Sequence, residues 1–89
     1  MDIEFDPTKA AANRKKHGVS FQEAATVLDD PMAVVSEDSS HPEHRFQAIG
    51  ASATGGILAV VFTYRGQRCR IISARQAERW ERRLYEERP

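Results

Sequence analysis

The chain has 89 residues, of which 40% are hydrophobic and 29% charged, and its 13 basic and 13 acidic residues give no formal net charge. This size predicts one domain, residues 1–89, and the composition is that of a folded globular protein rather than a disordered one. The single Cys69 excludes an intramolecular disulfide and a cysteine-rich zinc site. Neither a membrane-spanning apolar run nor a signal-peptide pattern is present in the sequence, so we expect a cytoplasmic protein with no membrane partner.

The zero net charge hides an uneven distribution. Residues 1–20 carry a net charge of +1, residues 21–64 carry −5, and residues 65–89 carry +4. All eight basic residues of the last segment are arginines, whose planar guanidinium groups suit phosphate better than lysine does. The C-terminal quarter therefore predicts either a phosphate-binding groove or an arginine-rich helix that is simply solvated.

The first third of the chain predicts a short strand and two helices. Residues 2–5 alternate polar and apolar, which is typical of a strand. A helix is then expected to begin with Asp6 as its N-cap and Pro7 as its first residue, and to stop at Gly18. A capping box at residues 20–23 starts a second helix, which the sequence Asp-Asp-Pro at residues 29–31 ends.

The remainder predicts four strands and a last helix. Strands are expected at residues 32–35, 45–51, 57–64 and 68–73, with a polar loop at 37–43 and a hairpin turn at 65–67. Ser73 and Gln76 have the spacing of a helix start, so a helix should follow with Ala77, Trp80 and Leu84 on its buried side. The order β-α-α-β-β-β-β-α predicts a small α+β domain, in which an antiparallel sheet is covered by two N-terminal helices and one C-terminal helix.

Four arginines form the strongest candidate site. Arg68 and Arg70 share one face of the expected strand, and Arg75 is placed in the first turn of the expected last helix, whose free N–H groups favour an anion. With Arg65 they predict a phosphate seat. The alternative is that these arginines pair with Glu78, Glu81 or the acidic middle of the chain.

RNA cleavage is one reaction that such a site can perform without a metal, because the ribose 2′-hydroxyl can attack the adjacent phosphate while arginines stabilise the charge. The candidates for the acid and the base, none of them singled out by the sequence, are His17, His44, Tyr64, Glu78, Glu81 and Tyr85. A metal-dependent hydrolase using His41, His44 and nearby acids is a weaker alternative. Cys69 is expected to be a buried, inert thiol.

Three segments occur in an order that is similar to one known family. They are Phe5-Asp6-Pro7-x-Lys9-x-x-x-Asn13-x-x-Lys16-His17-Gly18-Val19-Ser20-Phe21-x-Glu23-Ala24, then Asp29-Asp30-Pro31, then Arg70-Ile71-Ile72-Ser73-Ala74-Arg75-x-Ala77-x-x-x-Glu81-Arg82-x-x-Tyr85. This pattern resembles the BrnT family of ribonuclease toxins from bacterial type II toxin–antitoxin systems. The resemblance implies a RelE-like fold, metal-independent RNA cleavage, and neutralisation by a BrnA antitoxin. The ribbon-helix-helix domain of BrnA binds DNA, and the complex represses its own operon.

The resemblance also selects site residues. The residues at its motif positions are Lys9, Asn13, His17, Arg70, Ser73, Arg75, Glu81 and Tyr85. From the chemistry of these motif residues, we predict that Arg70 and Arg75 hold the phosphate and that His17 or Glu81 transfers protons. We predict that Lys9, Arg65, Arg68 and Arg79 bind phosphates of the RNA. No metal and no other cofactor is expected. The alternative is a non-catalytic interaction module, or a decayed toxin that acts with an antitoxin in operon repression.

Overall fold

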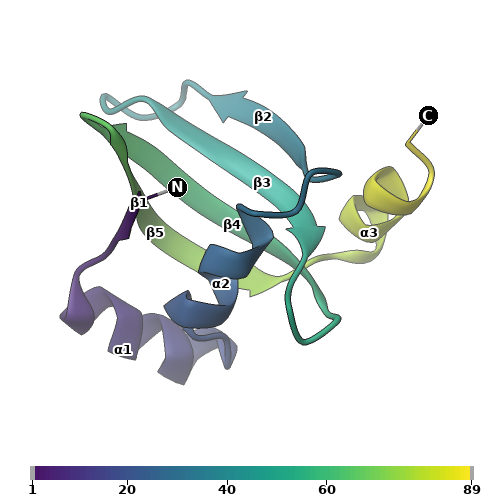
Figure 1. The fold of residues 1–89 in the computed structure, drawn as a ribbon, viewed down its shortest axis with the longest axis horizontal. Helices are drawn as coiled ribbons and strands as arrows, with labels where there is room; N and C mark the ends of the chain where they lie inside the picture. Colours follow the sequence, from purple (N-terminus) through teal and green to yellow (C-terminus); the bar gives the residue numbers. More distant parts are fainter. Residues whose placement is uncertain (1, 89) are drawn as a thin grey trace.

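The computed structural model describes residues 2–88 of the chain and contains five strands and three helices in that range (Figure 1). The elements are β1 (Asp2–Glu4), α1 (Pro7–His17), α2 (Phe21–Val27), β2 (Val34–Asp38), β3 (Arg45–Ala51), β4 (Ile57–Arg65), β5 (Arg68–Gln76) and α3 (Arg79–Glu86). The predicted α+β class and the predicted element order are confirmed. No helix within residues 2–88 is long and apolar enough to cross a membrane.

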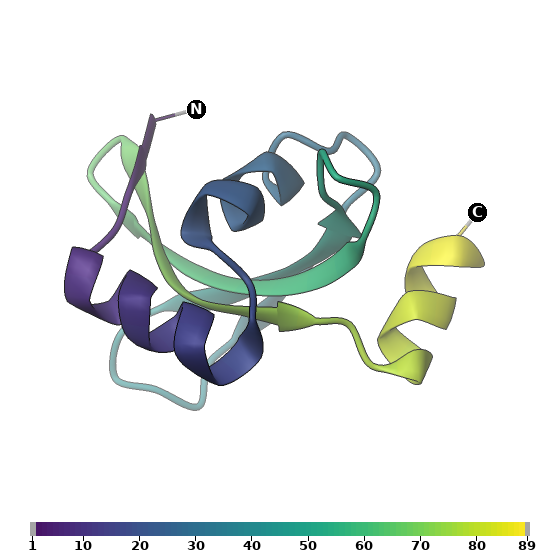
Figure 2. The ribbon, with the colours of Figure 1, turned by 90° about the horizontal axis from the view of Figure 1, so that it is seen from below.

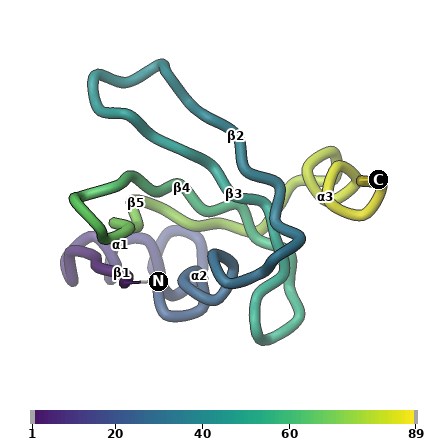
Figure 3. The backbone as a smooth tube through the Cα atoms, turned by 45° about the horizontal axis from the view of Figure 1, so that its top comes forward, coloured from purple at the N-terminus to yellow at the C-terminus, as the bar shows by residue number. Residues whose placement is uncertain are grey.

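The five strands form one sheet in the order β1-β5-β4-β3-β2. The last four strands make an antiparallel meander, as expected, with β2 at the edge far from α1 (Figure 3). β1 adds to the opposite edge and runs parallel to the first residues of β5, where Glu4 lies beside Arg70. The sheet is therefore mixed at one edge, because α1 and α2 carry the chain across the sheet between β1 and the meander.

The two N-terminal helices cover one face of the sheet, and the main core lies between them (Figure 2). α2 buries Phe21, Ala24 and Val27 against apolar side chains of β4 and β5 such as Leu58 and Ile71. α3 lies apart from these helices, beyond the end of the sheet (Figures 1 and 2). The sheet thus has an inner face toward α1 and α2, and an outer face that those two helices leave open.

The helix boundaries in the first third follow the local signals. The Asp6 carboxylate accepts a hydrogen bond from the Thr8 N–H at 2.8 Å, and Gly18 ends α1 with a φ of 72°. A positive φ costs glycine little because it has no Cβ. The Ser20 hydroxyl accepts a hydrogen bond from the Glu23 N–H at 3.0 Å and caps α2. The predicted N-caps of α1 and α2 and the predicted end of α1, each of which depends on only a few neighbouring residues, are therefore correct.

The predicted start of the last helix is wrong. β5 continues through Ser73 to Gln76, because these residues pair with β4 from Leu58 to Val61. α3 begins at Arg79, with Glu78 as its N-cap, five residues beyond the predicted N-cap Ser73. Pairing with a buried central strand satisfies the backbone of residues 73–76, so the local capping signal at Ser73 is overridden.

The expected buried side of that helix is wrong as well. Trp80 and Leu84 are 60% and 46% exposed, whereas Glu81 is completely buried. The expected strand at residues 32–35 is also displaced, since β2 spans Val34–Asp38 and extends into the predicted loop. Its pairing with β3 from Arg45 to Ile49 fixes that position. Cys69 is buried, and burial raises the pKa of its thiol.

Candidate functional site

A β-bulge in β5 determines which way its arginines point. Phe62 of β4 lies opposite Ile71, whereas the preceding Val61 lies opposite Ser73. Ile72 is therefore an extra residue in this strand. Since side chains alternate along a strand, one extra residue exchanges the two faces for every residue that follows it.

The bulge brings Arg70 and Arg75 to the same face. Arg70 lies opposite Thr63 and Arg75 lies opposite Ala59, and these two residues of β4 are four positions apart. Both arginines consequently project from the outer face, although they are five positions apart and would otherwise lie on opposite faces. The residue before Arg75, Ala74, packs into the main core on the inner face.

Glu81 of α3 holds the Arg75 side chain. Arg75 Nη1 donates to Glu81 Oε1 at 2.6 Å, and Arg75 Nη2 donates to Glu81 Oε2 at 2.9 Å. The Glu78 N–H donates to the same Oε1 at 2.9 Å, and the Gln47 side-chain amide reaches Oε2 at 3.5 Å. The Glu81 side chain is 1% exposed, whereas that of Arg75 remains 34% exposed. A buried carboxylate thus fixes a guanidinium that still reaches solvent.

Both members of this pair are charged at neutral pH. Burial raises the pKa of Glu81, but the hydrogen bonds from Arg75 and from the Glu78 N–H, with the Arg75 charge, outweigh burial and hold the pKa below its ordinary range. The hydrogen bond to Glu81 raises the pKa of Arg75, against the opposing effect of burial. Glu81 therefore carries no proton near pH 7 and has no oxygen that lacks a hydrogen bond.

The other candidate arginines also lie near carboxylates. Arg70 Nε donates to Glu4 Oε2 at 2.9 Å, and Arg68 Nη1 lies 3.8 Å from Glu4 Oε1. Arg65 Nη2 lies 3.5 Å from Glu43 Oε2. Glu4 is thus shared by Arg68 and Arg70, and Glu43 lies near Arg65 and also 3.7 Å from Arg45 Nε. The side chains of Arg65 and Arg68 are 53% and 63% exposed, so these ion pairs are weak.

Three motif residues of α1 follow one side of that helix along the edge of β5. The buried Asn13 donates to the carbonyls of Val19 and Ala74 at 3.0 and 2.8 Å, and it accepts from the Ala74 N–H at 3.1 Å. Lys9 and His17 lie one helical turn before and after Asn13 and are exposed. Asn13 is therefore a structural clamp, and it brings this side of α1 to the residue that precedes Arg75.

A second polar contact fastens α3. The Tyr85 hydroxyl donates to Asp30 Oδ2 at 2.6 Å, and the same oxygen accepts from the Ala51 N–H at 2.9 Å. Asp30 Oδ1 accepts from the Met32 N–H at 2.9 Å. The Asp-Asp-Pro motif and the C-terminal tyrosine thus contact each other, and both have structural partners. Burial raises the pKa of Asp30, but the hydrogen bonds from Tyr85, Ala51 and Met32 outweigh burial and lower it.

The structure assembles part of the predicted site. Arg75 and Glu81 form an ion pair at one end of the outer face, and Arg70 projects from the same face four β4 positions away, beside Glu4. Arg65 and Arg68 lie at the β4–β5 hairpin end. Arg79 lies apart from them, exposed on α3. The expectation that Arg75 occupies the first turn of a helix is wrong, because it belongs to β5. The proposed contribution of helix N–H groups to the phosphate seat is therefore lost.

Sequence reasoning missed two residues of the outer face, both on β3. Gln47 contacts the Arg75–Glu81 pair through Glu81. Arg45 shares the outer face with Gln47, two residues along the strand, and its Nε is buried without a hydrogen bond. One signal was available, since Arg45 is the single basic residue between positions 21 and 64.

The histidines considered as metal ligands do not converge. His41 Nε2 lies 3.7 Å from Asp38, whereas His44 contacts Glu37. Within residues 2–88 no group of three His, Cys, Asp or Glu side chains has the arrangement of a metal site. His44 instead stacks on Phe46, with ring centroids 5.4 Å apart.

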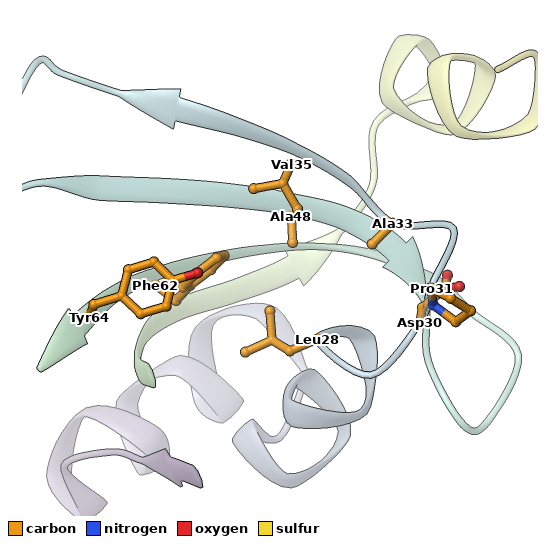
Figure 4. A pocket seen from close by; sticks show the side chains of 8 residues that line it. All are labelled: Leu28, Asp30, Pro31, Ala33, Val35, Ala48, Phe62 and Tyr64. Carbon is orange, nitrogen blue, oxygen red and sulfur yellow. The ribbon is translucent and has the colours of Figure 1, made fainter. Parts of the chain in front are cut away.

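An apolar pocket lies on the inner face beside α2 (Figure 4). Its volume is about 230 Å³, and it lies between the end of α2 and strands β2 to β4. The lining residues are Leu28, Asp30, Pro31, Ala33, Val35, Ala48, Phe62 and Tyr64. Of the acid–base candidates only Tyr64 lines it, and Arg70, Arg75, His17 and Glu81 do not.

Two comparisons with known proteins agree on one family. Residues 5–81 match the family model described as the ribonuclease toxin, BrnT, of the type II toxin–antitoxin system. The chain belongs to the BrnT family. Its structure is similar to the crystal structure of the Brucella abortus ribonuclease toxin, BrnT, with a TM-score of 0.71 and 30% sequence identity. The alignment covers 89% of this chain and 99% of the Brucella chain. The comparison with curated protein sequences gives no significant match.

Membership of the BrnT family confirms the resemblance seen in the sequence and makes the chain a member of a family of ribonuclease toxins that have an antitoxin as partner. The match includes Lys9, Asn13, His17, Arg70 and Arg75, and it ends at Glu81. Tyr85 lies beyond the matched range, although its contact with Asp30 ties it to a segment within that range.

Proposed function

We propose that this BrnT family member is a metal-independent endoribonuclease whose phosphate seat is the outer face of β5. The observation that carries the proposal is the placement of Arg70 and Arg75 on one face, with Arg75 fixed by the buried Glu81. Two guanidinium groups on one rigid strand can bind a phosphate and stabilise the charge that grows on it in the transition state.

The proposed reaction is a transesterification within the RNA. The 2′-oxygen bonds to the adjacent phosphorus and its proton goes to a base, while the bond to the 5′-oxygen breaks and that oxygen receives a proton. The products are a 2′,3′-cyclic phosphate and a 5′-hydroxyl. We assign proton transfer to His17 from its motif position and its exposed side chain. Asn13 holds α1 to Ala74 at the β5 edge that β1 leaves uncovered, so the bound RNA is proposed to pass around that edge between His17 and the outer face.

Glu81 receives a different role from the one that the sequence suggested. Its carboxylate is buried, ionised and hydrogen-bonded on both oxygens, so it is suited to hold Arg75 and not to exchange protons with a substrate. We propose that it is a positioning residue. Lys9, Arg65, Arg68 and Arg79 are proposed to bind neighbouring phosphates of the RNA, because all four are exposed cations.

The proposed partner is a BrnA-type antitoxin with a ribbon-helix-helix domain, and DNA is contacted only through that complex. Family membership supports an antitoxin. The placement of Arg70 and Arg75 on the outer face supports RNA as the substrate and gives no reason to expect a lipid surface. The proposed place of action is the cytoplasm, where its RNA substrate is found.

Incubation of the purified, antitoxin-free protein with total RNA in EDTA tests this proposal. We expect cleavage by the parent protein, and none by Arg70→Ala or by the double variant Arg75→Met/Glu81→Leu. The double variant removes both charges together, so that no unpaired carboxylate remains buried. Arg82→Ala is the matched control for loss of one positive charge and should cleave like the parent, whereas the two inactive variants, identically purified, control for nuclease contamination. Equal cleavage by all four proteins would overturn the assignment.

A non-catalytic or decayed toxin remains the second candidate, favoured by one observation. Arg70 and Arg75 are already paired with Glu4 and Glu81, as expected for arginines with only a structural role. This alternative predicts RNA affinity without cleavage, both in the absence and in the presence of ribosomes. Cleavage that appears only when ribosomes are added would instead identify a ribosome-dependent enzyme.

A further inference from the structure

Helix α1 carries four cations and no carboxylate. Lys9, Arg14, Lys15 and Lys16 are all exposed, and no ion pair between residues 2 and 88 includes any of them. The one acidic residue between positions 5 and 18 is Asp6, whose carboxylate caps the start of the helix. The surface of α1 is therefore positively charged along its own length.

The elements that pack against α1 do not cancel this charge. β5 contains no carboxylate, and α2 contains one, Glu23, which accepts hydrogen bonds from the hydroxyls of the turn between β3 and β4. In β1, Asp2 and Glu4 lie opposite Arg68 and Arg70 in the register of the sheet. The cations of α1 thus remain available to an anionic partner.

The orientation of α1 places two of its lysines beyond the edge of the sheet. Asn13 faces the backbone of Ala74 at the β5 edge, and Ala10 packs against the main core. Around the helix, Ala10 lies about 60° to one side of Asn13, whereas Lys9 and Lys16 lie about 40° and 60° to the other side. The direction that leads from the core to the sheet edge therefore continues to these two lysines, which lie two turns, or about 10 Å, apart.

The same edge of the sheet borders the proposed phosphate seat. β1 pairs with β5 at residues 68–70, before the part of β5 that Asn13 contacts. Arg75 directly follows Ala74 and projects from the outer face. A chain that leaves Arg75 across this edge consequently arrives at the lysine side of α1 (Figure 1).

We propose that Lys9 and Lys16, which we name the α1 lysine pair, bind phosphates that flank the cleaved bond of a single-stranded RNA. The substrate then turns around the β5 edge from the outer face to α1. This inference rests on the proposed function, because it takes the outer face to be the place of cleavage. A duplex is too stiff for this turn, since a double helix bends appreciably only over about 500 Å and the longest extent of the protein is 33 Å.

The composition of the α1 surface favours nucleic acid over a protein segment. Protein interfaces are anchored by aromatic or aliphatic side chains, whereas nucleic-acid interfaces are more polar and much more positive. Among residues 2–88, the large hydrophobic side chains that are exposed all lie outside α1, at Met32, Val35, Tyr64, Trp80 and Leu84. The α1 lysine pair thus offers charge without an apolar anchor.

Binding of an uncleavable RNA tests the proposal. A 2′-O-methyl oligonucleotide has no free 2′-hydroxyl, so the proposed reaction cannot cut it, and fluorescence anisotropy gives its affinity as the salt concentration is varied. For a labelled single strand of about ten nucleotides, each lost phosphate contact should lower the salt slope by about 0.7 and the affinity at about 0.1 M salt about fivefold. We expect this loss in Lys9→Gln and in Lys16→Gln, and about twice the loss of slope in the double variant.

Lys15→Gln is the matched control within the same helix. Lys15 is adjacent to Lys16, exposed and without an ion pair to residues 2–88, but it lies about 160° around the helix from Asn13 and points away from the β5 edge. We therefore expect Lys15→Gln to keep the salt slope of the parent. A duplex of the same sequence should show no difference in slope between the parent and the double variant.

Each other outcome contradicts a particular statement. Equal salt slopes in the parent and the double variant, or an equal loss of slope in Lys15→Gln, would overturn the role of the α1 lysine pair. A duplex that loses as much slope as the single strand would contradict the single-stranded substrate. Weaker binding of purified antitoxin by the double variant, with unchanged RNA binding, would assign the pair to the antitoxin. A parent that binds through the pair but leaves unmodified RNA intact would contradict the proposed ribonuclease alone.

Discussion

The buried carboxylate of Glu81 binds the Arg75 guanidinium through both of its oxygens, at 2.6 and 2.9 Å. The two residues come from different elements, since Arg75 lies near the end of β5 and Glu81 lies in the first turn of α3. A β-bulge is needed to turn Arg75 toward this partner. A buried ion pair therefore orients one arginine, Arg75, which we propose binds a phosphate.

The stability of single and double variants should reveal this pair. Arg75→Ala leaves the Glu81 charge buried and unpaired, so we expect a loss of about 2–3 kcal/mol in the free energy of unfolding, at the low end for a buried pair because Arg75 is partly exposed. Arg75→Met/Glu81→Leu removes both charges and should recover most of that loss. Urea unfolding of the parent, the single and the double variants measures both changes. A double variant no more stable than Arg75→Ala would contradict the pairing.

Glu81→Gln separates a positioning role from proton transfer. The amide keeps the size of the side chain but presents only one acceptor to Arg75, so we expect kcat to fall at least about tenfold, with a smaller change in KM. The pH dependence of the remaining activity should keep the shape of the parent profile. If Glu81 were the base, its substitution would remove one limb of that profile. His17→Gln, by contrast, is expected to change the shape.

The hydrogen bond between Tyr85 and Asp30 should contribute to the attachment of α3. Tyr85→Phe removes a hydroxyl that donates to a carboxylate at 2.6 Å, and for a partly exposed site we expect a loss of about 1 kcal/mol. Tyr64→Phe is the matched control, since the Tyr64 hydroxyl makes no hydrogen bond to any residue between 2 and 88 and the side chain is half exposed. Thermal unfolding of both variants measures the difference. Equal melting temperatures would contradict this role.

Local signals in the sequence were sufficient for the N-terminal helices and for the order of the elements. The Asp6 cap, the Gly18 stop and the Ser20 cap each act within a few residues, so one stretch of chain contains all the information. The apolar run of β4 likewise predicted a central strand correctly. Arg70, Arg75 and Glu81 were identified as site residues for their chemistry and by resemblance.

Features that depend on distant partners were not predicted. Ser73 begins a plausible helix locally, but pairing with β4 keeps it in a strand. The bulge at Ile72 cannot be recognised from the alternation of polar and apolar residues, so the sequence did not predict which face of the sheet Arg75 occupies. Trp80 was expected inside because it is apolar, yet Glu81 takes that position since an arginine on another element pairs with its charge.

Asn13 should be among the residues that stability depends on most. Its side chain satisfies the carbonyls of Val19 and Ala74 and the N–H of Ala74, all in a buried setting. Asn13→Ala leaves these three groups without this partner, for which we expect a loss of about 3 kcal/mol. Lys16→Ala, an exposed change on the same helix, should cost less than about 0.5 kcal/mol. Similar denaturation midpoints for the two variants would contradict the clamp.

Acidification should destabilise the protein through Glu81 and Asp30. Hydrogen bonds outweigh burial and lower the pKa of both carboxyl groups in the folded state. Their contribution to stability is therefore complete above the unfolded-state pKa of about 4, and it is lost as the pH falls through the folded-state values. Tyr85 has the opposite sign. The Asp30 hydrogen bond and burial raise its pKa, so its contribution is complete below about pH 10 and is lost at higher pH.

Urea unfolding as a function of pH measures the loss of stability at acid pH and at alkaline pH, the acid and alkaline limbs of the stability profile. The free energy of unfolding should be flat near neutral pH and should fall below about pH 4. In Glu81→Gln the acid limb should be shallower, because one group that takes up a proton on unfolding is gone, and in Tyr85→Phe the alkaline limb should be shallower for the equivalent reason. Acid limbs of equal slope in the parent and in Glu81→Gln would show that the carboxylate of Glu81 is not stabilised by Arg75.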